Sequence, residues 1–336
     1  MFKKKVYIVG AFPPGVGGVA TYNLLLEKLL IKDSFSVEVV DFSYYNFYNF
    51  LKKLFQIKKS SILVDSYRIS IESISFKRLP FYLLMIFFKQ IKWIRIVHDG
   101  TFPEQYNNFS KLKKIFLKIS LLFIYKTVCV SEDLKDFFDN NSLGKNKTMI
   151  IGSLLPFYKV FNLSKTTKEN IIVTSGAFTA NYSIKDVLLA YSNLDDSIKK
   201  DYRLIILKTS FSQDSDYQDK IDWFIKQKKL NVKIYNNLDY SETLKIFSIS
   251  KIYVRSVKKE SFGLSKVESV ILGNQVVTTE TGITNYMHTY EHGNYKDLHQ
   301  KILYCISIDN EDNEARTFYI TEAEKNYNLL KELIYD

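Results

Sequence analysis

The chain has 336 residues, of which 46% are hydrophobic and 15% aromatic, and it carries a formal net charge of +11. Its two cysteines, Cys129 and Cys305, exclude a disulfide framework and a thiolate metal site, and favour a cytoplasmic protein. The longest apolar run, residues 79–88, is well short of the ~18 residues that a membrane-spanning helix requires, so we expect no transmembrane segment.

In the first half of the chain, short runs rich in β-branched residues alternate with helical patterns. The first run follows three lysines and ends at Pro13 and Pro14, which favours a buried strand over a signal peptide. Alternation of this kind predicts a parallel sheet with helices on both faces. The expected strands are 6–9, 37–40, 62–64, 94–97 and 127–130.

A glycine-rich loop separates the first strand from the first helix. Gly15, Gly17 and Gly18 allow a tight turn, and the helix that follows presents unpaired amides that suit a phosphate or diphosphate. A plain strand-to-helix turn would use glycine as well. The segment from Gly15 to Ala20 also matches a dinucleotide fingerprint, with the acid at position 41 placed to bind a ribose. That fingerprint is disfavoured because its first glycine should follow the strand directly, whereas residues 11–14 separate the strand from Gly15.

The positive charge is concentrated in the first half. Residues 1–165 contain 25 Lys and Arg against 12 Asp and Glu, whereas residues 166–336 contain 22 against 24. Two lysine-rich amphipathic helices are predicted there. Each is either an ordinary helix that packs its apolar face on the core and leaves its lysines in water, or a helix that attaches the protein to an anionic bilayer. Nucleic acid is not expected, because no recognised binding motif is present. The first helix has Phe47, Phe50, Leu51 and Leu54 beside Lys52, Lys53, Lys58 and Lys59, and the second has Phe109, Leu112, Phe116, Ile119 and Phe123 beside Lys111, Lys113, Lys114 and Lys118.

The alternation pauses between residues 155 and 170, which we interpret as a linker, and then resumes. We therefore expect two α/β domains in tandem, 1–155 and 156–320, with a cleft at the carboxyl edges of their sheets. The strands expected in the second domain are 171–174, 204–207, 232–235, 252–254 and 275–278.

Two glutamates follow the fourth expected strand of the second half. Glu260 lies in the loop and Glu268 lies about two turns further on, inside the next helix. The amides of Phe262, Gly263 and Leu264 would face an anion at the helix N-terminus. Carboxylates placed in this way can accept hydrogen bonds from sugar hydroxyls on either side of a diphosphate. By itself the spacing is weak evidence, because exposed helices often carry glutamate.

With its neighbours, this segment resembles the retaining nucleotide-sugar glycosyltransferases of the GT-B fold that have a Glu-x7-Glu signature, as in glycosyltransferase family 4. The stretch "ESFGLSKVESVILGNQVVTTETG" is the most specific part, and "PPGVGGVATYNLLLEKL", "RIVHDG", "VCVSEDLKDFF" and "IIVTSGAF" with "IKDVLLAY" extend the likeness over nearly the whole chain. The resemblance implies an α/β protein with two Rossmann-like domains whose parallel sheets face a central cleft. Its first domain would hold the acceptor, its second the nucleotide-sugar, and a last helix within 321–336 would pack back on the first.

The resemblance also implies roles for individual residues. Glu260 would contact the donor sugar, Glu268 the nucleotide ribose, and the amides between them the sugar and phosphate. The glycine loop would close over the diphosphate. His98, of "VHDG", would hydrogen-bond a sugar hydroxyl near the reacting centre. Alternatively, His98 is an ordinary polar residue at the end of a strand. The implied catalytic residues are His98, Lys185 and Glu260, and the implied donor-binding residues are Gly17, Gly18, Arg255, Phe262, Gly263, Leu264 and Glu268.

One diphosphate-binding residue of the family is absent from this sequence. The family places an arginine just after the glycine that ends the first strand of the second domain, and a lysine about a turn further on. Lys185 fits the lysine, but Gly176 is followed by Ala177. We expect Arg255 or Lys208, at the ends of other strands, to supply the missing charge.

The implied reaction needs neither a protein nucleophile nor a metal ion. The diphosphate leaves from the anomeric carbon, Lys185 and two helix N-termini stabilise its charge, and its own oxygen accepts the proton of the acceptor, so configuration is retained. The Asp-x-Asp pair that begins at Asp214 matches a metal-binding motif, but it is placed to cap a helix. Because His288, His292 and His299 lack partners at ligand spacing, we expect no metal and no cofactor.

The expected function is the transfer of a hexose from a nucleoside-diphosphate donor to a glycan or lipid-linked acceptor. The resemblance implies a UDP-sugar as donor, because uridine is the family's commonest base. The basic first half favours bacterial lipopolysaccharide or capsule synthesis on the inner face of the plasma membrane. One alternative is an NAD(P)-dependent oxidoreductase that uses residues 15–20 and Asp41. The other is a non-catalytic scaffold at the membrane surface.

Overall fold

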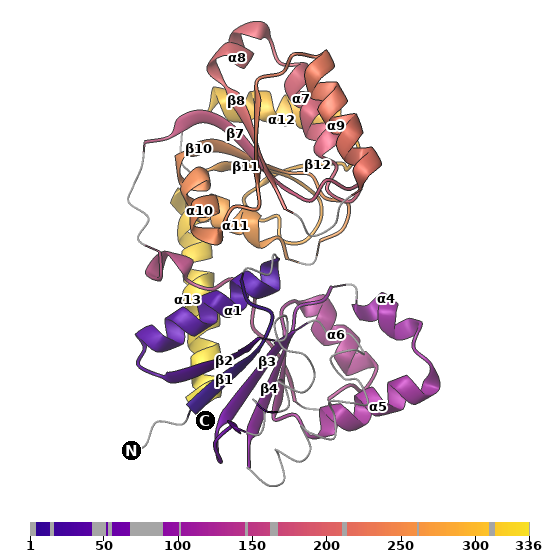
Figure 1. Ribbon diagram of the computed structural model, residues 1–336, viewed down its shortest axis with the longest axis vertical. Coiled ribbons are helices and arrows are strands. Elements are labelled where there is room, and N and C mark those ends of the chain that lie inside the picture. Colours follow the sequence, from indigo (N-terminus) through magenta and orange to yellow (C-terminus); the bar gives the residue numbers. More distant parts are fainter. Residues whose placement is uncertain are drawn as a thin grey trace. The chain divides into compact units, whose positions relative to one another are not determined.

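The computed structural model describes residues 5–13, 17–41, 52, 56–67, 90–100, 102–144, 147–161, 167–209, 214–260, 262–308 and 313–335. The chain forms two compact units. The first comprises residues 1–160 and 323–336, and the second comprises residues 161–322. Each unit is built around a six-stranded sheet whose strand pairs are all parallel, and helices lie on both sides of the strands (Figure 1).

The first unit has the strand order β2-β1-β3-β4-β5-β6. The chain runs outward from β1 to β2 and then returns to β3 on the other side of β1. Its strands are β1 (Lys5–Gly10), β2 (Ser36–Asp41), β3 (Ile62–Tyr67), β4 (Lys92–Val97), β5 (Lys126–Cys129) and β6 (Thr148–Ile150). Its helices are α1 (Gly18–Lys32), α4 (Phe102–Asn107), α5 (Lys111–Leu122), α6 (Glu132–Asn140) and a 3-10 turn, η1 (Phe157–Lys159).

The second unit has the order β12-β11-β10-β7-β8-β9, in which the chain reverses direction between β7 and β10. Its strands are β7 (Glu169–Gly176), β8 (Arg203–Lys208), β9 (Val232–Asn236), β10 (Ser250–Arg255), β11 (Gln275–Thr279) and β12 (His288–Tyr290). Its helices are α7 (Ile184–Ser192), α8 (Asp196–Asp201), α9 (Ser215–Gln227), α10 (Tyr240–Ile249), α11 (Leu264–Ile271) and α12 (Tyr295–Ser307). The long helix α13 (Asn313–Tyr335) begins in this unit, and its residues from Ala323 onward belong to the first.

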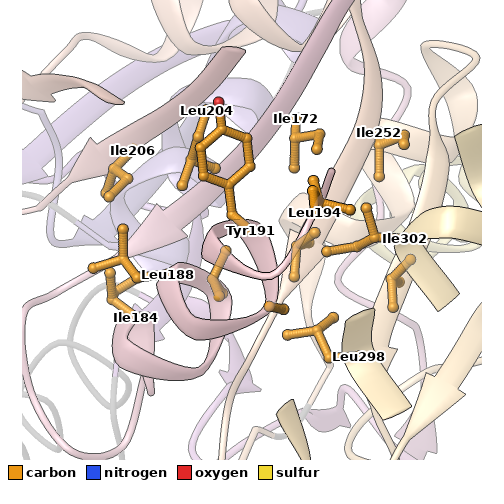
Figure 2. Close-up of a cluster of buried hydrophobic side chains, with 14 of the residues drawn as sticks. Ile172, Ile184, Leu188, Tyr191, Leu194, Leu204, Ile206, Ile252, Leu298 and Ile302 are labelled. Atoms are coloured by element: carbon orange, nitrogen blue, oxygen red, sulfur yellow. The ribbon is translucent and has the colours of Figure 1, made fainter. Parts of the chain in front are cut away.

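The core of the second unit lies between the sheet and helices α7, α9 and α12. Alternate residues of the central strands face this layer, including Ile172, Leu204 and Ile252, and they meet Leu188 of α7 and Ile302 of α12 (Figure 2). All of these side chains are fully buried. A sheet covered on both faces in this way explains the continuous apolar runs of the sequence.

The ten strands expected from the sequence all form, and the two-domain α/β fold is confirmed. Two strands, β6 and β12, were not expected: each has only three residues and lies at the edge of its sheet. The lysine-rich helix predicted over residues 47–59 falls mostly outside the described residues. None of the helices in the part of the chain that the structure describes has the length and apolarity needed to cross a bilayer.

The second lysine-rich helix is α5, and it does not pack as its sequence pattern suggests. Leu117 and Leu121 are buried, with Ser120 between them donating a hydrogen bond to the Leu117 carbonyl (2.7 Å). Leu112 and Ile119, which we placed on the apolar face, are exposed. All sides of this helix carry apolar residues, so periodicity alone could not identify the inward side.

Candidate active site

The carboxyl edge of the second sheet offers a natural binding position where β7 and β10 lie side by side. In open α/β sheets, ligands bind outside the carboxyl ends of the strands at the point where the chain reverses direction. Strand β7 ends at Gly176 and β10 ends at Arg255. Thr174 pairs with Val254, so the last residues of both strands reach this point together.

A buried ion pair occupies this position. The Nε of Arg255 donates to Oε1 of Glu260 (3.1 Å), its Nη2 donates to the same oxygen, and its Nη1 donates to the carbonyl of Ser175 (2.8 Å). The two side chains are 11% and 12% exposed. Burial opposes ionisation of Glu260, but the charges of Arg255 and then Lys266 outweigh it and lower the pKa of the carboxyl group. Glu260 is therefore an anion held between two cations.

Lys266 is the second cation, and its side chain is fully buried beneath the loop. Its Nζ lies 3.7 Å from Oε2 of Glu260 and donates to the carbonyl of Thr281. Burial lowers the pKa of Lys266 to about 8. Sequence reasoning missed this residue, because lysine is rarely buried and its helical position carries no other signal.

Gly263 makes room for this arrangement at the start of α11. Its φ of +83° is one that residues with a side chain rarely adopt. A Cβ at this position would lie 2.2 Å from Cε of Lys266 and 2.7 Å from Oε2 of Glu260. Since α11 has no side-chain cap, the amides that begin at Leu264 remain available to an anionic ligand. Phe262 is nearly buried, and its carbonyl accepts a hydrogen bond from the amide of Ile283 (3.1 Å).

The loop that carries Glu260 is fastened to the neighbouring loops. The amide of Lys258 donates to the carbonyl of Asn181 (2.8 Å), and the hydroxyl of Thr279 donates to the carbonyl of Val257 (2.6 Å). These bonds join the segments that follow β7, β10 and β11. The position of the carboxylate is thus set before any ligand arrives, which is how proteins reduce the cost of ordering a site.

Glu268 lies on the same helix as Lys266 but has a separate partner. It is buried, and it accepts a hydrogen bond from the hydroxyl of Tyr240, the first residue of α10. Burial raises the pKa of Glu268 to about 7. The ring of Tyr240 in turn packs edge-on against Phe161, with the ring centroids 5.3 Å apart. Sequence reasoning did not identify Tyr240, which lies 28 positions before its partner.

Two other cations lie at the carboxyl ends of strands or in the helix that follows. Lys208 pairs in register with Gly176 across β8 and β7, donates to Gln218, and lies 5.0 Å from the ring centroid of Phe178. Lys185 is exposed in the first turn of α7. Ala177 leaves no charge directly after β7, and Arg255 and Lys208 flank the strand end at which the resemblance implies an arginine.

Asp214 and the three histidines of this unit have structural partners. Asp214 accepts a hydrogen bond from the amide of Tyr217 (3.1 Å) and caps α9, as expected. His292 lies 2.7 Å from the hydroxyl of Ser183, and His299 bonds the carbonyl of Ala190. His288 contacts Gln275. Within the described residues, no three His, Cys, Asp or Glu side chains gather in a way that would hold a metal ion.

In the first unit, the glycine loop leads into an uncapped helix. Gly17 has a φ of +143° and Gly18 begins α1, and among the described residues a Cβ on either glycine would meet no atom within 4 Å. The first turn of α1 has no side-chain cap and no acidic residue, so its amides suit an anion. Gly15 lies outside the described residues. Gly10 has a structural reason to be glycine, because its Cβ would lie 2.2 Å from the carbonyl oxygen of Ser66.

His98 follows β4 at the carboxyl edge of the first sheet. Its Nε2 lies 2.9 Å from the hydroxyl of Ser66, which belongs to β3, and its ring lies 4.6 Å from that of Tyr22 on α1. Desolvation lowers the pKa of His98 to about 4, so its imidazole is neutral at pH 7. A neutral imidazole can donate or accept one hydrogen bond with a ligand hydroxyl.

Comparisons with solved structures agree with this architecture. HepE from Anabaena, solved with UDP and glucose, is 13% identical, with a TM-score of 0.72 and 99% of each chain covered. A glycosyltransferase from Rickettsia africae is 18% identical, with a TM-score of 0.67 and coverage of 99% of this chain and 98% of its own. Sucrose-phosphate synthase from Thermosynechococcus elongatus is 12% identical, with a TM-score of 0.65 and coverage of 98% and 95%. These likenesses establish the fold.

Sequence comparison identifies the family. A search of curated proteins found no match. The sequence profile of the family "Glycosyl transferases group 1", however, matches residues 159–334, which include the ion pair, the uncapped helix α11 and the buried Glu268. A family of sugar-transferring enzymes disfavours both the oxidoreductase and the non-catalytic scaffold. The chain belongs to the group 1 glycosyl transferases.

Proposed function

We propose that this protein transfers a hexose from a UDP-hexose donor to a glycan or lipid-linked acceptor with retention of configuration, releasing UDP. The observation that carries the proposal is the buried Arg255–Glu260 pair beside the uncapped N-terminus of α11. It combines, at the position where this fold takes ligands, an acceptor for sugar hydroxyls with donors for phosphate oxygens. The fold is also that of HepE, whose structure contains UDP and glucose.

In this proposal the second unit binds the donor. Glu260 accepts hydrogen bonds from the donor sugar, Glu268 accepts them from the ribose, and the amides of Phe262, Gly263 and Leu264 meet the sugar and the phosphates. Glu260 is well suited to this, because its anionic state is maintained by two cations. Glu268 must be ionised to accept from both ribose hydroxyls, so donor binding should strengthen as the pH rises through 7.

Arg255 is our candidate for the missing diphosphate arginine. A guanidinium has five N–H donors, and the contacts to Glu260 and Ser175 use three of them. Two donors remain for phosphate oxygens. Lys185 would supply a second cation from α7, whereas Nζ of Lys208 already donates to Gln218. Positive groups fixed in advance around the departing diphosphate lower the barrier without needing a protein nucleophile or a metal ion.

The first unit would contribute the acceptor side of the reaction. Gly17 and Gly18 would approach the diphosphate through backbone amides, and His98 would hydrogen-bond a hydroxyl of the donor sugar. The acceptor oxygen attacks the anomeric carbon as the diphosphate leaves with its electron pair, and a diphosphate oxygen takes the acceptor proton. Because both events take place on one face of the sugar, its configuration is retained.

The positive charge of the first unit fits the synthesis of a surface polysaccharide, such as lipopolysaccharide or capsule, on the inner face of the plasma membrane.

Titration calorimetry tests the donor proposal. The protein is titrated with UDP, GDP, ADP and NADH in buffer containing EDTA, and the titration is repeated with Glu268→Ala. Glu291→Ala is the matched control, because Glu291 is an exposed glutamate of the same unit. We expect UDP to bind without metal, and Glu268→Ala to weaken the affinity at least tenfold while the control leaves it unchanged.

The other outcomes distinguish the alternatives. Binding of GDP or ADP in place of UDP would support the assignment as a transferase and identify a different donor nucleotide. Binding of NADH alone would contradict sugar transfer and restore the oxidoreductase. Binding that requires added Mg²⁺ would overturn the metal-independent reaction.

A further inference from the structure

Helix α5 exposes a row of aliphatic side chains to solvent. Leu112 and Leu122 are 68% and 69% exposed, and Ile115 and Ile119 lie between them at 52% and 39%. With 100° between successive residues, these four positions share one side of the helix and form a continuous ridge. Scattered exposed leucines are ordinary, but a row extending along a whole helix indicates a contact surface.

The ridge is held rigidly in place. The opposite side of α5 is buried through Leu117 and Leu121. The Ser110 hydroxyl accepts from the amide of Lys113 at the N-terminus, and Lys147 donates to the carbonyl of Leu122 (2.7 Å) at the C-terminus. A side-chain hydrogen bond therefore holds each end of α5 in place.

The charge along α5 and the residues next to it in sequence has a single sign. Residues 105–131 contain five lysines and no Asp or Glu. Lys111 and Lys118 are exposed and lie seven positions apart, so both flank the same edge of the ridge. Lys114 is engaged elsewhere, because its Nζ donates to the Asn107 carbonyl and lies 4.8 Å from the ring centroid of Tyr106.

We propose that the α5 ridge, formed by Leu112, Ile115, Ile119 and Leu122, lies on an anionic lipid bilayer with Lys111 and Lys118 against its headgroups. An interfacial helix of this kind buries aliphatic side chains at the acyl boundary, and lysine ammonium groups contact anionic lipid. A second copy of the chain fits less well, because pairing two ridges would bring the lysines of both copies together. Nucleic acid would not explain four exposed aliphatic residues. The inference rests on the first unit alone and does not depend on the donor.

Vesicle flotation tests the inference on the full-length protein. Vesicles of phosphatidylcholine alone are compared with vesicles that also contain phosphatidylglycerol. We expect binding only to the anionic vesicles. The double variant Lys111→Gln/Lys118→Gln should reduce the partition coefficient about 25-fold, at roughly fivefold per lysine, and Leu112→Ser/Leu122→Ser should reduce it at least tenfold.

Two controls locate the effect. Lys220→Gln/Lys226→Gln removes the same charge from exposed positions of α9 and should not change binding. Lys113→Gln changes an exposed lysine of α5 that lies away from the ridge, and its effect should be smaller than that of either Lys111 or Lys118. Circular dichroism and thermal unfolding, measured in parallel, show that each variant is folded.

Three results would overturn the inference. The first is a wild-type protein that does not float with anionic vesicles. The second is an α9 variant that loses as much binding as the ridge variants. The third is a dimer, detected by light scattering, that Leu112→Ser/Leu122→Ser converts to a monomer. The last result would assign the ridge to a second copy. Failure of UDP to bind would instead contradict the proposed donor and leave vesicle binding unaffected.

Discussion

The buried carboxyl group of Glu268 predicts a variant that gains stability as it loses function. Glu268 is 3% exposed, and burial raises its pKa from 4.5 to about 7. Below pH 4.5 the group is protonated in both the folded and the unfolded chain. Above pH 7 it is ionised in both, and folding must then bury the charge. A pKa raised by roughly 2.5 units corresponds to about 3 kcal/mol of stability, which is lost as the pH rises through this range.

Glu268→Gln preserves the shape of the side chain and removes its charge. The hydrogen bond from Tyr240 already contributes to that pKa, so the expected gain is about 3 kcal/mol at pH 8 and almost none at pH 4.5. For a unit of this size, we expect Tm to rise by roughly 6–12 °C at pH 8. UDP affinity should fall at the same pH, because a neutral amide is a poorer acceptor for ribose hydroxyls.

Thermal unfolding followed by circular dichroism at pH 4.5 and pH 8 measures the effect. Glu291→Gln changes an exposed glutamate of the same unit and should leave Tm unchanged at both pH values. A Glu268→Gln variant that is no more stable than the wild type at pH 8 would refute the reasoning. So would an equal gain at both pH values, because the gain would then not come from the charge.

Two further predictions concern the ion pair and the glycine beside it. Arg255→Met removes the nearer of the two cations beside Glu260 and leaves Lys266, 3.7 Å away, so the free energy of unfolding in urea should fall by about 3 kcal/mol, at the lower end of the range for a broken buried pair. Adding Glu260→Gln should restore part of the loss; no restoration would mean that the pair is not the cause. Gly263→Ala should cost more stability than Gly293→Ala, because both glycines have a similar positive φ, +83° and +87°, but only the first would clash with Lys266. Equal losses would show that backbone strain alone matters.

The strands were predictable because fully buried parallel strands require apolar, β-branched residues, and such runs stand out between helical patterns. The edge strands β6, "TMI", and β12, "HTY", have too few residues to show any alternation. Helix α5 forms where it was expected, but the prediction of which residues face the core was wrong in part. The tertiary contacts of Leu117 and Leu121 decided that orientation, and no local pattern reports them.

In the candidate site, the sequence identified the charged residues that belong to a recognisable motif. The roles of these residues stay predictions. It placed Arg255 as a replacement cation, and the structure pairs that residue with Glu260. The buried Lys266 and the hydroxyl of Tyr240 were not foreseen. Both act on motif residues from positions that look ordinary in sequence, because contacts between separate helices depend on how those helices pack.

Helix α13 has a consequence for how the protein is made. Residues of its second half complete the core of the first unit: Tyr327 and Leu330 are buried there, and Asn326 accepts a hydrogen bond from the amide of Gly152 (3.1 Å). The ribosome must therefore synthesise residues 161–322 before the first unit can finish folding. The usual order, in which the N-terminal domain is complete first, cannot hold. Until α13 arrives, the apolar surface that it covers on the first unit is open to chaperones.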